Sequence, residues 1–260
     1  MKTQDLKVSI IQTDLAWENK SKNFKHFEEL INAIELDTNL IILPEMFTTG
    51  FSMNAENLYD SPEGETLDWM KKNSKIKDVA ITGSVIIKEN GKFYNRLYFV
   101  KPDGSFHTYD KKHLFTLAGE HNHYSAGQKK LIVNYKGWKI CPLICYDLRF
   151  PTWARNTEDY DLLIYIANWP QKRVSAWDAL LKARAIENMS YCIGVNRIGE
   201  DGNGFPYTGH SAIYDALGER ISTDLFEKAY VETKTLSKQH LIDIREKLGF
   251  LKDRDRFKLL

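Results

Sequence analysis

The sequence predicts an α/β fold in which two β-sheets are sandwiched between helices within one domain. Strand-like and helix-like segments alternate almost from end to end, with no repeat, low-complexity tract or linker between them. The chain has 260 residues and is 43% hydrophobic, which is enough to bury a large core. Mixed strands flanked by helices favour a layered arrangement.

The first half of the chain predicts strands, two helices and an antiparallel meander. Short apolar runs bounded by turn residues are typical of strands, and apolar residues three and four apart indicate an amphipathic helix. Turn sequences at 89–92 and 102–104 separate the strands of the meander. The predicted segments are strands 8–12, 40–43, 79–87, 94–100 and 106–109, a helix carrying Phe24, Phe27, Leu30, Ile31 and Ile34, and a helix around 67–70.

The second half repeats this alternation. The predicted segments are strands 138–144, 162–167, 191–196, 211–214 and 229–232, and helices at about 175–189 and 238–248. Gly218 lies in the turn between the last two strands. We therefore expect a single domain over 1–260, with a C-terminal helix and charged tail from about residue 237.

Composition excludes several classes of protein. The net charge is +1 and the basic residues form no stripe, so the sequence does not predict a nucleic-acid partner. The N-terminus is polar, and apolar runs such as 162–167 are too short to span a bilayer, so we expect neither a signal peptide nor a membrane partner. Three cysteines without metal-ligand spacing favour a reduced, cytoplasmic protein.

The segment 144–151, with sequence ICYDLRFP, places a thiol where an apolar strand ends. A nucleophile at a sharp strand-to-helix turn is exposed to backbone N–H groups and to the positive end of the helix. Pro151 suits the first turn of that helix. Cys145 is therefore a candidate nucleophile, although a free cysteine is also often a small buried hydrophobe.

Three further segments carry candidate chemistry. Glu45 follows the buried strand 40–43, and a carboxylate partly removed from water there suits proton transfer near neutral pH. Lys111 and Lys112 follow the strand 106–109, and because successive strand residues face opposite sides, at most one should point into a site. Glu120 follows as a third candidate carboxylate.

Several histidines lie near Glu120 and could be mistaken for metal ligands. His113, His121 and His123 lack the helical HExxH spacing, and neighbouring loop residues rarely converge on one ion. We therefore expect these histidines to serve in packing or hydrogen bonding, and we expect no metal site.

These motifs together resemble those of the nitrilase superfamily of carbon–nitrogen hydrolases. LPEMF carries Glu45, YDKKHLF carries Lys111 and LICYDLRFP carries Cys145, and the resemblance extends from the strand at 8–12 to the turn at Gly218. It implies a four-layer α-β-β-α sandwich, a homodimer formed through the helix after the nucleophile and the C-terminal segment, and no metal or organic cofactor. It also implies that Glu120 holds the lysine and the substrate amide.

The resemblance implies hydrolysis of a small amide through a thioester. Cys145 would attack the amide carbon, and Glu45 would accept the thiol proton and pass it to ammonia. Lys111 and the backbone N–H of Tyr146 would hold the oxyanion. A nearby lysine is also expected to lower the pKa of the thiol.

The segments ANWP, KARAIEN and NR with DGNG look most like the bacterial omega-amidase group, which implies 2-oxoglutaramate or 2-oxosuccinamate as substrate. A distal carboxylate needs a cationic clamp, for which Lys172 and Arg173 are candidates. Arg149 is another candidate, or else an ion-pair partner for the nucleophile turn. Trp169 is expected to form a wall of the pocket. Arg184 and Glu187, three apart on one helix, are expected to pair at the surface or at a subunit contact.

Three alternatives remain open at this point. Another hydrolase of the superfamily, acting on a nitrile, an N-carbamoyl amino acid or an aliphatic amide, would use the same three residues but release different products. A non-catalytic metabolite-binding protein would form no covalent adduct on Cys145. A metallohydrolase would lose activity on chelation.

Overall fold

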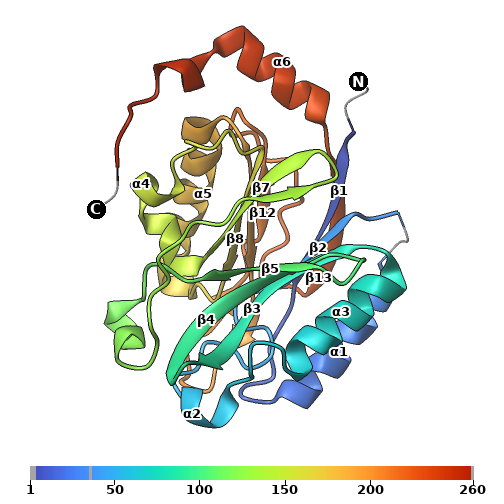
Figure 1. The fold of residues 1–260 in the computed structure, drawn as a ribbon, viewed down its shortest axis with the longest axis vertical. Helices are drawn as coiled ribbons and strands as arrows, with labels where there is room; N and C mark the ends of the chain where they lie inside the picture. The colour runs from blue at the N-terminus through green and yellow to red at the C-terminus, as the bar shows by residue number, and fades with distance from the viewer. Residues whose placement is uncertain (1–3, 35–36, 259–260) are drawn as a thin grey trace.

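The computed structural model describes residues 4–34 and 37–258 (Figure 1). Its larger sheet has six strands in the order β13-β1-β2-β3-β4-β5, with β1, β2 and β3 parallel and the others antiparallel to their neighbours. The strands are β1 Leu6–Gln12, β2 Leu40–Ile42, β3 Ala80–Glu89, β4 Lys92–Val100, β5 Phe106–Asp110 and β13 Tyr230–Leu236.

Two helices, α1 Lys20–Asn32 and α3 Glu65–Lys77, cover the outer face of this sheet (Figure 1). The alternation of side chains along each strand explains the arrangement. Ile11 and Ile41 pack in a cluster with residues of these helices, whereas their neighbours Ile10 and Ile42 belong to the core shared with the second sheet. Both faces of β1 and β2 are therefore buried, in keeping with the entirely apolar sequence of β2 and the apolar residues Leu6, Val8, Ile10 and Ile11 of β1.

The second sheet has five strands in the order β12-β9-β8-β7-β6, and β7, β8 and β9 are parallel. Helix α5 covers its outer face and one-turn α4 lies beside α5 (Figure 1). The elements are β6 Val133–Tyr135, β7 Trp138–Ile144, β8 Leu162–Ala167, β9 Tyr191–Asn196, β12 Ala212–Tyr214, α4 Pro151–Ala154 and α5 Val174–Asn188.

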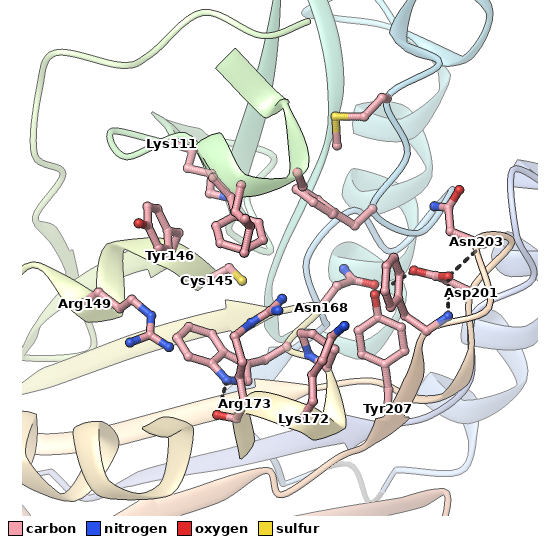
Figure 2. Close-up of a pocket in the computed structure, with 18 residues that line it drawn as sticks. Lys111, Cys145, Tyr146, Arg149, Asn168, Lys172, Arg173, Asp201, Asn203 and Tyr207 are labelled. Atoms are coloured by element: carbon pink, nitrogen blue, oxygen red, sulfur yellow. Dashed lines mark hydrogen bonds between the residues drawn. The ribbon is translucent and has the colours of Figure 1, made fainter. Parts of the chain in front are cut away.

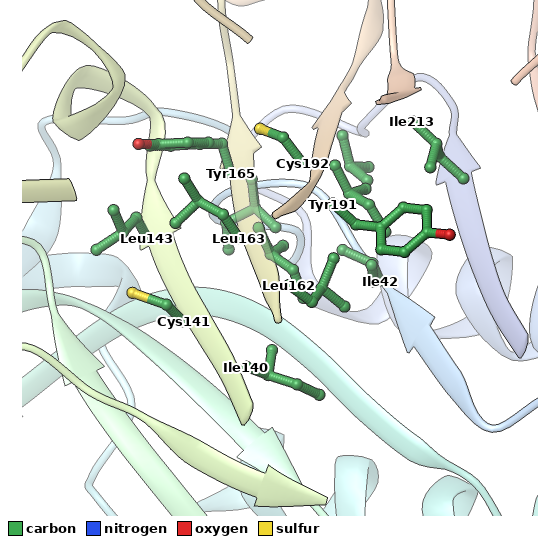
Figure 3. Close-up of a cluster of buried hydrophobic side chains, with 14 of the residues drawn as sticks. Ile42, Ile140, Cys141, Leu143, Leu162, Leu163, Tyr165, Tyr191, Cys192 and Ile213 are labelled. Carbon is green, nitrogen blue, oxygen red and sulfur yellow. The ribbon is translucent and has the colours of Figure 1, made fainter. Parts of the chain in front are cut away.

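The two sheets meet in a continuous apolar core. Figure 3 shows Ile42 of the larger sheet near Leu162 of the smaller one. Cys141 and Cys192 are fully buried in this core, and burial raises the pKa of the Cys141 thiol to about 12. These two thiols therefore act as small apolar side chains.

The C-terminal helix α6, Lys238–Leu248, closes one end of the sandwich (Figure 1). The Ser237 side chain caps its first turn, and Leu241 is fully buried on its inner face. Arg245 donates hydrogen bonds to the Met189 and Tyr160 carbonyls, at 2.8 and 2.6 Å. The helix is thereby attached to the smaller sheet.

The predicted α/β sandwich with helices on both outer faces is confirmed. The two strands predicted on either side of Gly218 lie in different sheets, because β13 pairs with β1 and β12 with β9. The helix expected to have Pro151 in its first turn is α4, which is only one turn long, and a 3-10 turn, Cys145–Arg149, separates it from β7. The structure also contains short elements that were not predicted: α2 Ala55–Leu58, β6, β10 Ile198–Glu200 and β11 Pro206–Thr208.

Within residues 4–34 and 37–258, no helix has the length and apolar character needed to cross a membrane.

Candidate active site

Cys145 lies directly after β7, at the first position of a tight turn. Its φ is +43°, a left-handed backbone conformation that residues other than glycine, asparagine and aspartate seldom adopt. Such a conformation costs of order 1–3 kcal/mol and persists only where the surroundings impose it. The turn directs the thiol into a cavity, while the residue as a whole is only 9% exposed.

Asp147, which is fully buried, holds this turn in place. One carboxylate oxygen accepts hydrogen bonds from the Ile144 N–H (3.0 Å) and the Tyr109 hydroxyl (2.8 Å). The other lies 2.8 Å from His113 Nδ1 and accepts from the His113 N–H. The nucleophile turn is therefore tied to the segment that carries Lys111. His113 also stacks on Phe150, in keeping with the packing role expected for it.

Glu45 follows β2 in the other sheet and is fully buried. Its Oε1 accepts hydrogen bonds from Lys111 Nζ (2.9 Å) and Asn95 Nδ2 (2.8 Å). Its Oε2 accepts from the backbone N–H of Asn168, which follows β8, at 2.8 Å. Groups from both sheets thus fix both carboxylate oxygens, and the carboxylate lies beside the Cys145 thiol.

Lys111 lies between two carboxylates, those of Glu45 and Glu120. Its side chain is fully buried, and Nζ is 3.0 Å from Glu120. Burial alone would lower the pKa of Lys111, but the charges of Glu120 and Glu45 raise it above its ordinary value. The lysine is therefore a permanent cation beside the thiol. Lys112 instead donates to Gln128 at 3.2 Å, outside the cavity.

Glu120 completes the group of charged side chains. Its carboxylate accepts the Phe115 N–H at 2.5 Å as well as Lys111 Nζ. Burial raises the pKa of Glu120, the positive charge of Lys111 opposes that shift, and Glu45 adds to it. Glu120 and Glu45 thus together hold the Lys111 ammonium in place.

The pKa of the Cys145 thiol is raised well above its ordinary value. Burial is the largest cause, and the negative charge of Glu45 adds to it; Lys111 opposes both without cancelling them. Lys111 does lower the thiol pKa, as expected, but the expectation of a net lowering is wrong, because burial and the charge of Glu45 outweigh the lysine. A neutral thiol needs a base before it can attack a carbon, and Glu45 is adjacent.

Of these residues, Lys111 and Cys145 line a cavity of about 580 Å³ (Figure 2). Tyr146, Arg149, Trp169, Lys172 and Arg173 line it together with Lys111 and Cys145. Trp169 forms a wall of the cavity, and the Arg149 guanidinium lies over its ring, 4.9 Å from the ring centroid. The Arg173 guanidinium lies 4.9 Å from the centroid of the Phe115 ring. Figure 2 shows the Arg173 side chain extending toward Cys145.

Besides Lys111, three cations line this cavity: Arg149, Lys172 and Arg173. None of them forms an ion pair with a carboxylate in the part of the chain that the structure describes. The alternative expectation for Arg149, an ion pair that supports the nucleophile turn, is wrong. Cations without a protein partner at the wall of a cavity suit an anionic ligand.

The model of the carbon–nitrogen hydrolase family matches residues 7–237. The chain belongs to this family. This carbon–nitrogen hydrolase is 46% identical to omega-amidase YafV of Yersinia enterocolitica over 98% of this chain and 99% of that one. It is 33% identical to 2-oxoglutaramate amidase of Bacillus subtilis, over 95% and 96% of the two chains.

Among solved structures, this hydrolase superposes on XC1258 of Xanthomonas campestris with a TM-score of 0.97. The two are 39% identical, and the match covers 99% of this chain and 100% of the other. That structure is described as a CN-hydrolase superfamily protein with an arsenic adduct in the active site. The resemblance to the nitrilase superfamily and the expected sandwich fold are both confirmed.

Sequence reasoning missed several residues that support the site of this hydrolase. Asn95, Asn168 and Asp147 each hold a candidate catalytic segment through buried hydrogen bonds. Asn168 follows an apolar strand just as Glu45 does, and that pattern could have identified it.

Arg184 does pair with Glu187 at 2.8 Å, but the expected surface location is wrong for Arg184. Arg184 is buried and donates to the Leu148 carbonyl at 2.6 Å, so it supports the nucleophile turn from behind.

The histidines lie apart from this arrangement. His121 and His123 are exposed, and neither lines the cavity. No three His, Cys, Asp or Glu side chains gather in a metal-binding arrangement among the residues that the structure describes.

The two neighbouring lysines should behave very differently when each is replaced. We expect Lys111→Ala to lower kcat/KM for an amide by at least roughly 10²–10³-fold, because it removes the expected oxyanion donor and leaves the buried carboxylates of Glu45 and Glu120 without their shared cation. Lys112→Ala is the matched control and should change the rate by less than a few fold. Steady-state ammonia assays on both variants test this. Loss of activity in Lys112→Ala alone would contradict it.

Proposed function

We propose that this hydrolase is an omega-amidase, which releases ammonia from the terminal carboxamide of a small 2-oxo dicarboxylic monoamide such as 2-oxoglutaramate or 2-oxosuccinamate. The observation that carries this proposal is the cavity itself. It places the thiol of Cys145 and three cations without carboxylate partners around one space. A substrate can therefore place its amide at the thiol and its carboxylate at the cations. The two amidases named above support the same assignment.

The reaction begins with the neutral thiol. Glu45 accepts the proton of Cys145 Sγ as the sulfur attacks the amide carbon, and the carbonyl oxygen becomes negative. Lys111 Nζ and the backbone N–H of Tyr146 hold that oxyanion, and Glu120 keeps Lys111 in position. Glu45 then gives its proton to the departing nitrogen, the carbon–nitrogen bond breaks, and ammonia leaves a thioester on Cys145.

Water completes the cycle. Glu45, now a carboxylate again, removes a proton from a water molecule that attacks the thioester carbon. The carbon–sulfur bond breaks, the sulfur takes the proton from Glu45, and the product leaves as a carboxylic acid. Glu45 thus acts in both halves of the reaction, and this scheme requires no imidazole, metal or organic cofactor.

The assignment is tested by a panel of amides and nitriles assayed for ammonia, with intact-mass detection of the acyl adduct. We expect a 2-oxo dicarboxylic monoamide to be a better substrate than a neutral aliphatic amide of similar length. If the neutral amide, a nitrile or an N-carbamoyl amino acid is the better substrate, the omega-amidase assignment fails. The protein would then be a carbon–nitrogen hydrolase with another substrate.

Arg173→Ala should reveal the carboxylate clamp. Arg173 lies partly buried on the wall of the cavity, so its loss should raise KM for the carboxylate-bearing amide by about 10- to 100-fold, the worth of one charged hydrogen bond. The KM for a neutral amide should change little. Lys129→Ala, which removes an exposed lysine outside the cavity, is the control. Equal increases for both amides in Arg173→Ala would contradict the clamp.

We also propose that residues 1–260 act as one domain in a cytoplasmic homodimer formed through α5 and the C-terminal segment. Ile186 of α5 is 46% exposed, and the turn at Gly218 lies against it, with Leu217 45% exposed. Phe250, after α6, is 58% exposed. Exposed apolar side chains on these elements suit a subunit contact. Light scattering that gives the mass of one chain would contradict the dimer.

A further inference from the structure

Asn168 has a side-chain orientation fixed by its neighbours. Its Nδ2 donates to the backbone carbonyl of Glu45 at 2.6 Å, and its backbone N–H donates to Glu45 Oε2 at 2.8 Å. Because a carbonyl oxygen can only accept, Nδ2 must face Glu45 and Oδ1 must face away from that carbonyl. The residue is 5% exposed and lines the cavity that holds Cys145.

The Oδ1 atom of Asn168 is buried and has no hydrogen-bond partner among the described residues. An unsatisfied buried acceptor destabilises the folded protein, and such an atom beside a reactive thiol calls for an explanation. Only a donor can satisfy it. The carboxylates nearby are already engaged, since Glu45 accepts three hydrogen bonds and Glu120 accepts from Lys111 and Phe115.

The reacting amide offers both kinds of group. Its oxygen needs donors, which Lys111 and the Tyr146 N–H supply. Its NH₂ group needs acceptors and must lie near Glu45, because that carboxylate protonates the departing nitrogen. Asn168 is bonded to Glu45 at two points, so its free acceptor lies beside the same carboxylate.

We propose that Asn168 Oδ1 accepts a hydrogen bond from the NH₂ group of the substrate carboxamide, and that this contact makes the enzyme selective for primary amides over esters of the same acid. The inference rests on the proposed amidase function. It assigns Asn168 a direct contact with the reacting group, in addition to its support of Glu45. It also accounts for product release, since once the product acid has ionised, a carboxylate oxygen in place of NH₂ faces another acceptor.

The test compares an amide with the methyl ester of the same acid, because the ester has no N–H to donate. We expect Asn168→Ala to lower kcat/KM for the amide about tenfold more than for the ester. Asn95→Ala is the matched control: Asn95 also holds Glu45 but does not line the cavity. It should lower both rates by the same factor. An unchanged amide-to-ester ratio in Asn168→Ala would overturn the proposal.

A second measurement does not depend on whether Asn168→Ala folds. With Cys145→Ala, which leaves Asn168 intact, calorimetry should show that the intact amide binds about tenfold more tightly than its methyl ester. Equal affinities would overturn the proposal. The proposed function is tested separately, by whether the wild-type protein hydrolyses a 2-oxo dicarboxylic monoamide. If it does not, the same comparison applies to the best amide of the panel and its ester.

Discussion

Cys145→Ala should abolish ammonia release, with a loss of about 10⁶-fold, the scale seen when an enzyme loses its covalent nucleophile. The fold should survive, because alanine removes only the sulfur atom and keeps the Cβ that already tolerates φ of +43°. No other cysteine can substitute, since Cys141 and Cys192 are fully buried in the core between the sheets. The measurements are ammonia release, thermal unfolding and intact mass after incubation with substrate.

Two controls make this result specific. Cys141→Ala and Cys192→Ala should keep the acyl adduct and turn over within a few fold of wild type. Cys145→Ser should bind substrate yet remain nearly inert, because the hydroxyl is a much weaker nucleophile in the same position. Ammonia release by Cys145→Ala above a trace of the wild-type rate would exclude the thioester mechanism.

Glu45→Gln should lower the rate of ammonia release by more than the roughly 10²–10⁴-fold that a single acid–base step supplies, because in the proposed mechanism Glu45 transfers protons in both acylation and deacylation. The shape is preserved but the base is gone. Mass spectrometry should therefore show no accumulated thioester. A trapped thioester would mean that Glu45 serves only the second half of the reaction. Glu56→Gln, at an exposed position of α2, is the control and should be fully active.

The same variant should also change the titration of the thiol. The negative charge of Glu45 raises the pKa of Cys145, so its removal should lower that pKa, with Lys111 still favouring the thiolate. Alkylation of Cys145 by iodoacetamide should then begin at lower pH in Glu45→Gln than in wild type. A shift of the alkylation profile to higher pH would contradict the charge arrangement described here.

The sequence predicts the positions of Glu45, Lys111 and Cys145 well because each follows a strand, and strand ends are recognisable from local apolar runs. Alternation along a strand indicates that at most one of Lys111 and Lys112 faces the site, and the resemblance of the YDKKHLF motif to the family selects Lys111. The pKa of Cys145 could not be predicted in this way, because it depends on a balance among burial, Glu45 and Lys111 that only the packed structure sets. Residues far apart in sequence are juxtaposed only by packing.

Arg184 and the last strands show the same limit. Local spacing correctly paired Arg184 with Glu187, but the contact with Leu148 depends on how α5 lies across the smaller sheet. Strand β13 was recognised as a strand, yet its partner β1 is more than two hundred residues away in the sequence. Periodicity gives the type of an element, while pairing between distant segments depends on the global fold.

The location of the site between the two sheets has a consequence for how activity arises. Glu45, Asn95 and Lys111 come from the six-stranded sheet, whereas Cys145 and Asn168 come from the five-stranded one. Neither sheet alone contains both the proposed nucleophile and the proposed base. A newly synthesised chain is therefore expected to be inactive until the two sheets pack together. Ammonia release during refolding should accordingly lag behind the return of secondary structure. Catalysis in this protein reports the completion of folding.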